Sequence, residues 1–219
     1  MSRSPWLTIV VYHYVRGSAP AARPGYRGPT PASFCGQMDY IGRHYQVVTA
    51  EQVMSALDGG AALPKRAAWL TFDDGYREHY DCVLPELLAR GWQGTFFPVG
   101  QAAEGTRLLD VRERRGRASS RRSSGASCPS AKRSWRASCT WESFSFTALR
   151  EAGMCLGGHS WSHPRLTRLT AAGQEEEIER SLAFLRTLGV GTDRWIMAYP
   201  HGDPAAPPSL PTVAAMLAA

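Results

Sequence analysis

The 219-residue sequence has no long hydrophobic run. A membrane-spanning helix needs about 20 consecutive apolar residues, and no segment of this chain approaches that length. The N-terminal stretch from Met1 to Ala22 has a basic start and an apolar run, as a signal peptide does, but His13 and Arg16 interrupt the apolar residues early. We therefore expect a cytoplasmic protein without a membrane partner, and secretion is the alternative.

The sequence also has few cysteines and no C-x-x-C pair. The five are Cys35, Cys82, Cys128, Cys139 and Cys155. An odd number without close pairs indicates neither a disulfide framework nor a zinc ribbon. We expect reduced thiols, as is usual in the cytosol.

A general excess of positive charge is missing too, although the formal net charge is +6. Ten basic and two acidic residues lie between Arg107 and Arg136, and the rest of the chain has 15 basic and 17 acidic residues. The only aromatic residue of that segment is Trp135, so it could offer phosphate contacts but little base stacking. We expect no specific nucleic-acid partner.

What the sequence does have is an alternation of strand and helix patterns. Strands are predicted at residues 6–15, 46–50, 67–72, 94–100, 154–159 and 194–200, and helices at 32–45, 50–57, 80–91, 140–153 and 171–189. The last three helices each end at a glycine, which is a usual stop signal. Alternating strands and helices indicate βαβ units with a parallel sheet or barrel.

Two segments depart from this alternation, and we assign residues 1–203 to one domain that contains the first of them. Residues 107–139 are rich in Arg and Ser, and residues 204–219 form a Pro/Ala-rich tail. Such bias is typical of disordered linkers. Our hypothesis is instead a shift of reading frame, because the regular patterns stop abruptly at both segments. Resequencing the gene tests it, and an unbroken frame matching this sequence would refute it.

The adjacent carboxylates Asp73 and Asp74 follow a predicted strand and precede Gly75. One interpretation is structural, because Asp-Asp-Gly suits a turn and an Asp can cap the next helix. The other is chemical, because paired carboxylates can bind a metal or move protons. Taken alone, the pair favours the structural interpretation.

The sequence HSWSHP places His159 and His163 four residues apart. A turn between them could bring both imidazoles to one metal ion. Pro164 disfavours a helical conformation at His163, so we expect a loop. A histidine pair by itself is weak evidence for a site.

Position strengthens the chemical interpretation. Five polar side chains fall at or just past the ends of predicted strands: His13, Asp73, Asp74, His159 and His201. Active sites of parallel α/β folds assemble at that edge of the sheet. We therefore expect these side chains to form one site.

Three short motifs, in this order, resemble those of the polysaccharide deacetylase family, or NodB homology domain. They are TFDDG at 71–75, HSWSHP at 159–164 and, more loosely, AYPHG at 198–202. The resemblance covers residues 6–105 and 140–203. It implies an α/β fold, a distorted (β/α) barrel that is incomplete at its C-terminal end in this chain. It also implies a divalent metal, usually zinc, and removal of N-acetyl groups from a polysaccharide or sugar substrate.

The resemblance also assigns roles by position. Asp74, His159 and His163 would bind the metal, and Asp73 would be the general base. The backbone N–H at His201 would stabilise the oxyanion. Tyr199 in the third motif would contact the substrate. His13 is not assigned by the resemblance: its place at a strand end suits a contact to the substrate or to a residue that binds it, and equally a local hydrogen bond.

Two features of the family's pattern are not found. The family often has an arginine in the third motif, but in this chain Ala198 stands in that region and Arg194 is not in register with it. The later motif, which supplies a histidine as the general acid, is not found in this sequence. The alternative is therefore a catalytically impaired remnant or a carbohydrate-binding protein of the same family. A non-haem iron oxygenase also uses two His and one carboxylate, but its usual fold does not match the βαβ pattern.

Overall fold

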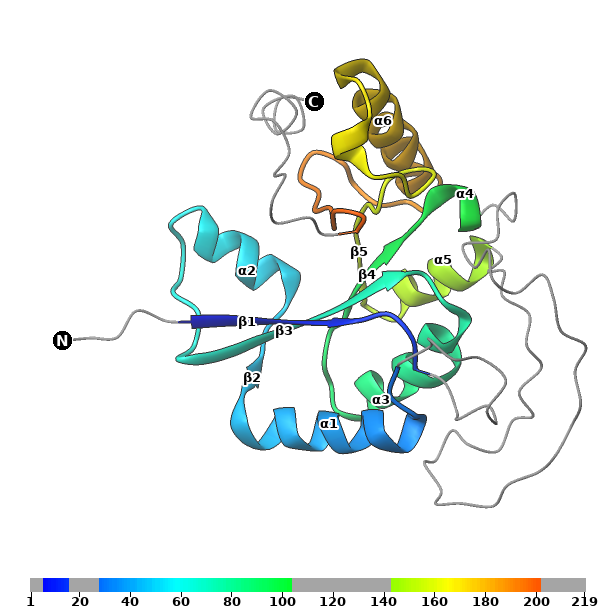
Figure 1. Cartoon of the computed structure of the whole chain (residues 1–219). Coiled ribbons are helices and arrows are strands. Elements are labelled where there is room, and N and C mark those ends of the chain that lie inside the picture. The colour runs from blue at the N-terminus through cyan, green and yellow to red at the C-terminus, as the bar shows by residue number, and fades with distance from the viewer. Residues whose placement is uncertain (1–5, 16–27, 104–142, 202–219) are drawn as a thin grey trace, which may run out of the picture.

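The computed structural model describes residues 6–15, 28–103 and 143–201, so the predictions for 107–139 and 204–219 fall outside the described residues. Strands and helices alternate along the chain (Figure 1). They are β1 (Trp6–Tyr12), α1 (Pro31–His44), β2 (Gln46–Val47), α2 (Ala50–Leu57), β3 (Arg66–Asp74), the π-helix η1 (His79–Val83), α3 (Leu84–Ala89), β4 (Thr95–Pro98), α4 (Gly100–Ala103), α5 (Ser143–Glu151), β5 (Cys155–Leu156), the 3-10 helix η3 (Leu166–Arg168) and α6 (Ala171–Thr187).

The strands form one five-stranded sheet in which every pairing is parallel. Its order is β1-β3-β4-β5, and β2 pairs with the start of β3. Parallel strands place their carboxyl ends at one edge, so the polar residues that end β3 lie beside the ends of β1 and β4. The expected α/β arrangement is therefore present in the described part of the chain.

Alternate residues of β3 enter two hydrophobic clusters. Leu70 and Phe72 belong to the larger cluster, together with residues of α1 and α3. Trp69 belongs to the smaller one, which contains Ala50 and Val53 from α2. Because side chains alternate along a strand, α1 and α3 cover one side of the sheet and α2 covers the other (Figure 1).

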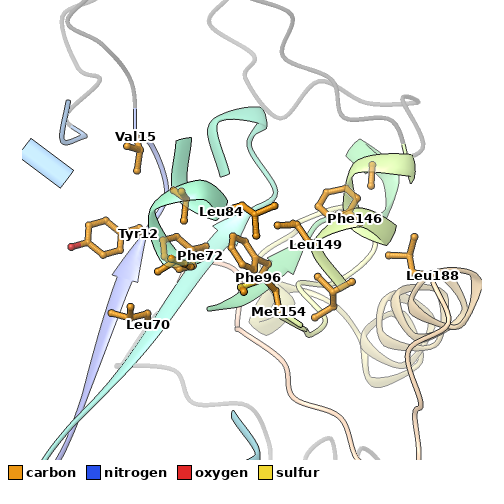
Figure 2. Packing of buried hydrophobic residues seen from close by; sticks show 14 of the residues in the cluster. Tyr12, Val15, Leu70, Phe72, Leu84, Phe96, Phe146, Leu149, Met154 and Leu188 are labelled. Carbon is orange, nitrogen blue, oxygen red and sulfur yellow. The ribbon is translucent and has the colours of Figure 1, made fainter. Parts of the chain in front are cut away.

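Aromatic side chains fill the centre of the larger cluster (Figure 2). The ring of Phe72 stacks between those of Tyr12 and Phe96, with centroid distances of 5.6 and 4.8 Å. This packing joins β1, β3 and β4 on the side of the sheet opposite Trp69. It fixes the relative positions of the strands whose ends carry the polar residues.

Local signals explain where the helices begin. Thr30 caps α1 by accepting a hydrogen bond from the Ser33 amide, and Pro31 is its first residue. Thr49 and Gln52 form a reciprocal capping box on α2. Beyond α6, Gly189 has a φ of 74°, a left-handed conformation that suits the predicted glycine stop.

Two predicted elements differ in the structure. The helix expected at 80–91 is a π-turn, η1, followed by the short α3. Pro85 lies at the start of α3 and has no amide proton to continue the regular ladder, while the Leu84 amide bonds back to the His79 carbonyl. The strand expected to end at Phe72 continues through Asp74, so the Asp pair closes the strand rather than following it.

The last predicted strand, at 194–200, is reduced to an isolated parallel bridge between Gly158 and Met197. The strand predicted at 154–159 is only Cys155–Leu156. At Gly157 a Cβ atom would lie 2.5 Å from the Phe97 ring and 2.6 Å from the Ile196 carbonyl oxygen. The glycine therefore allows the backbone around Ile196 to approach closely, at the cost of a regular ladder.

The described cysteines are Cys35, Cys82 and Cys155, and none of them forms a disulfide with another described residue. Within the described ranges, no helix is both long and apolar enough to cross a membrane.

Candidate active site

Asp73 and Asp74 end β3 and are both buried. Asp73 shares the sheet face of Trp69 and Thr71 by the alternation of the strand. Asp74 has a φ of 70°, an uncommon left-handed conformation for a residue other than glycine. The two neighbouring carboxylates consequently meet different partners.

The HSWSHP segment follows β5 and brings two imidazoles to Asp74. The Nε2 atoms of His159 and His163 both lie 3.3 Å from Oδ1 of Asp74. One candidate ligand atom from each of the three residues lies within 4.8 Å of the other two. The sequence-predicted ligand residues are therefore together, although they come from segments about 85 residues apart.

The other nitrogen of His159 is fixed by the backbone. Its Nδ1–H donates a 2.7 Å hydrogen bond to the carbonyl oxygen of Ala198. This bond leaves the lone pair of Nε2 directed at Asp74, which is the arrangement typical of a metal-binding histidine. Ala198 is itself held by a hydrogen bond from its amide to the carbonyl of Gly158.

A divalent metal fits these residues. Oδ1 of Asp74 is buried and has no hydrogen-bond partner, yet two imidazole nitrogens face it at equal distance. A buried carboxylate oxygen without a donor is costly, and a cation bound between the three groups would satisfy it. Two His and one carboxylate also form the ligand set of many catalytic zinc sites.

The charges of the cluster are strongly perturbed. Burial alone would raise the pKa of Asp74, but the adjacent imidazoles of His159 and His163 hold it far below its usual range. Burial raises the pKa of Asp73, and the adjacent Asp74 adds to the rise, while His159 and His13 oppose it. The pKa of His159 is raised because the two carboxylates outweigh its burial. Such perturbation is common at functional sites.

His13 lies at the end of β1, next to Asp73. Its Nε2 atom is 3.9 Å from Oδ2 of Asp73, and its side chain is 47% exposed. The buried His79 fixes the backbone there, because its Nε2–H donates a 2.7 Å hydrogen bond to the His13 carbonyl. His79 is thus a buried structural residue that supports the backbone of His13.

The third motif lies on the other side of His163. The rings of His163 and His201 are 4.5 Å apart between centroids, and His201 has a φ of 66°. Tyr199, two residues earlier, is partly buried, which raises its pKa. The roles assigned to His201 and Tyr199 stay predictions. Arg194 forms an ion pair with Asp58 on the surface. Its partner is therefore Asp58 and not a residue of the candidate site.

A cavity of about 530 Å³ lies elsewhere, between β1 and α1. Its lining includes Thr8, Val10, Gln37 and Tyr40, and none of the predicted site residues lines it. The candidate site is therefore the polar cluster at the strand ends and not this cavity.

A sequence profile described as Polysaccharide deacetylase matches residues 60–214, which is most of the chain. This protein belongs to the polysaccharide deacetylase family. The matched range contains the Asp pair, both histidines of HSWSHP and His201, so the motif-based resemblance is confirmed.

Individual relatives agree with the family. Poly-beta-1,6-N-acetyl-D-glucosamine N-deacetylase of Escherichia coli K12 is 46% identical over 56 residues, 26% of this chain and 8% of that protein. The chain thus matches only a small part of that relative's length.

Solved structures show the fold. The Streptococcus pyogenes deacetylase PplD, in complex with acetate, superposes with a TM-score of 0.70 at 20% identity, over 97% of this chain and 81% of that one. IcaB from Ammonifex degensii superposes with a TM-score of 0.65 at 21% identity, over 99% of this chain and 81% of that one. The predicted fold class, an α/β fold of the deacetylase barrel type, is confirmed.

Proposed function

We propose that this polysaccharide deacetylase family member is a metal-dependent hydrolase that removes N-acetyl groups from an N-acetylated glycan or sugar. The observation that carries the proposal is the convergence of Asp74, His159 and His163 on one point, with Asp73 beside it. Zinc is our choice of metal because a site of two imidazoles and one carboxylate suits it. A cytoplasmic location stays a prediction.

Asp74, His159 and His163 would hold the metal. When bound, the metal would polarise the acetyl carbonyl and lower the pKa of the attacking water. The hydrogen bond from His159 to Ala198 places the proton of the neutral ring on Nδ1, which leaves Nε2 to bind the metal, and it holds the ring in position. The burial of His159 and Asp74 excludes bulk water from these two ligands.

Asp73 would be the general base. Its Oδ1 atom is buried and accepts no hydrogen bond from the described residues, so none of them competes for the proton-accepting lone pairs of this oxygen. A base must lie within hydrogen-bond reach of the proton it removes. The position of Asp73 next to the ligand Asp74, with His13 rather than His163 as its nearest imidazole partner, supports this role.

His13 would supply the proton that the leaving amine needs. The sequence contains no later motif with a histidine acid, but the structure brings the His13 imidazole to 3.9 Å from Asp73. Its half-exposed ring can reach both the base and a substrate. This extends the substrate contact predicted for His13 to general acid catalysis, which is worth about 10²–10⁴ in rate.

The remaining assignments concern the third motif. The backbone N–H of His201 would donate to the oxyanion, and Tyr199 would contact the sugar. The swap from the family's usual Tyr to His at position 201 does not remove a backbone donor. The relative from E. coli is named as an N-deacetylase of poly-N-acetylglucosamine, which supports N-acetylglucosamine oligomers as the test substrate.

The test is metal analysis of the purified chain combined with acetate release from N-acetylglucosamine oligomers. We expect one divalent ion per chain and acetate release that a chelator abolishes. Asp74→Asn should lose both. A chain that binds no metal and releases no acetate would contradict the proposal, and metal binding without acetate release would favour the sugar-binding alternative.

A further inference from the structure

The loop from His159 to His163 has an uncommon backbone. Ser160 and His163 have φ values of 60° and 58°, in the left-handed region that residues other than glycine seldom adopt. Two such residues within five must be held by their surroundings. The contacts that hold them therefore set the geometry of both histidines.

One side of the loop is held by α4 and by the loop itself. The amides of Gly100 and Gln101 donate to the carbonyls of Ser160 and Trp161, at 3.4 and 2.8 Å. The His163 amide donates to Oγ of Ser160 at 3.1 Å. These bonds hold Ser160, Trp161 and His163, and a further element contacts the loop at Ser162.

That element is α6. Oε2 of Glu177 accepts a hydrogen bond from the Ser162 amide at 2.7 Å, and Oε1 accepts one from the Ser162 hydroxyl at 2.5 Å. Ser162 directly precedes His163. Three residues further along the helix, the Arg180 guanidinium lies 4.4 Å over the Trp161 ring. One face of α6 thus contacts the loop at two successive residues.

We propose that Glu177 is a positioning residue of the metal site. Its carboxylate holds Ser162 through two hydrogen bonds, and this fixes the left-handed His163 so that its ring meets Asp74. The proposal rests on the metal role that we give to Asp74, His159 and His163. A charged acceptor that binds both the backbone and the side chain of one residue gives more directional control than a surface ion pair.

The geometry separates this role from general stabilisation. Glu177 is only partly buried and is not among the apolar residues through which α6 packs on the core, such as Ile178 and Leu182. Its removal should therefore loosen the loop more than the fold. The effect should appear in metal affinity and in the mobility of the loop, including in the metal-free protein.

The experiment compares Glu177→Ala, Glu177→Gln and the control Glu179→Ala, which removes the same charge from an exposed position of the same helix. Zinc affinity is measured by competition with a chromogenic chelator. We expect Glu177→Ala to bind zinc about 10–100-fold more weakly, as for other groups that orient metal ligands. Glu177→Gln keeps one acceptor oxygen, so its zinc affinity should lie between those of Glu177→Ala and the unmodified chain. The zinc affinity of Glu179→Ala should equal that of the unmodified chain. Equal affinity in Glu177→Ala would overturn the proposal.

Hydrogen exchange of the metal-free proteins gives a second readout. Faster exchange of the 159–163 amides in Glu177→Ala, with the β3 amides unchanged, is the expected result. Unchanged exchange of the loop, or equal acceleration throughout the fold, would overturn the positioning role. If Glu177→Ala fails to fold, Ser162→Ala takes its place. This variant removes the hydrogen bond from the Ser162 hydroxyl and keeps the one from the amide, so the 159–163 amides should exchange faster by a smaller factor. If the unmodified chain binds no zinc, the proposed function fails, and the exchange comparison still tests Glu177 separately.

Discussion

At the scale of single residues, the backbone at Asp74 separates two adjacent carboxylates. The left-handed conformation there turns Asp74 toward His159 and His163, and Asp73 meets His13 instead. A turn or cap would leave both carboxylates near the surface. The structure buries both, which favours the chemical interpretation of the pair.

His13 gives the first prediction. If it donates the proton to the leaving amine, His13→Gln should lower kcat by about 10²–10⁴. Zinc content should stay unchanged, because His13 is not among the three clustered ligands. The measurement is kcat for acetate release at fixed metal content.

A matched control for His13 is His44→Gln, at the exposed end of α1. It should keep kcat. A His13→Gln variant with an unchanged kcat would contradict the general-acid role and leave only substrate contact for this side chain.

Motif residues were predictable because their chemistry constrains their type and spacing. The Asp pair, His159 and His163 are in this class. Glu177 and His79 were not predictable as parts of the site, because they act through hydrogen bonds to backbone atoms. Glu177 is one of three consecutive glutamates on a helix, and nothing in that run distinguishes it.

At the scale of elements, the segment after β5 depends on close backbone approach. Gly157 separates the Phe97 ring from the Ile196 carbonyl, which also accepts the Gly158 amide. Hydrophobic periodicity predicted a full strand at 194–200, but periodicity does not report how many ladder bonds form. The prediction of a strand was therefore wrong in extent: the structure has a single bridge between Gly158 and Met197 in this region.

Gly157→Ala gives the second prediction. The added Cβ would overlap Phe97 and the Ile196 carbonyl, so we expect a loss of about 1–3 kcal/mol of unfolding free energy. Urea denaturation measures it. Gly36→Ala in α1 is the control, since nothing lies within 4 Å of its Cβ, and it should stabilise the helix by about 0.5–1 kcal/mol. If Gly157→Ala and the unmodified chain had equal free energies of unfolding, the Phe97 ring and the backbone at Ile196 would be able to move aside without cost, and close packing at Gly157 would not be required.

At the scale of the whole molecule, the candidate metal site joins the end of β3 to the loop after β5. A ligand that binds only the folded state stabilises it by about 2.7 kcal/mol at a concentration 100 times Kd. For a chain of this size, that corresponds to a rise in Tm of roughly 5–10 °C. Scanning calorimetry with and without zinc measures this third prediction.

The control for the calorimetry is Asp74→Ala, which removes the shared carboxylate. Its Tm should not respond to zinc. A similar rise in both proteins would mean that zinc binds somewhere other than this cluster.

The order of strands and helices and the fold class followed from the sequence, because burial and periodicity are properties of each segment. The predictions for residues 107–139 and 204–219, including the reading-frame hypothesis and the domain boundaries, concern parts outside the described ranges. They stay predictions until the gene is resequenced.

The most direct test of the central claim is acetate release by Asp73→Asn at equal zinc content. The substitution keeps the size of the side chain and removes its ability to accept a proton. We predict that the variant binds zinc as the unmodified chain does and releases acetate from N-acetylglucosamine oligomers about 10²–10⁴-fold more slowly. An unchanged rate at equal zinc content would contradict the assignment of Asp73 as the base in this site.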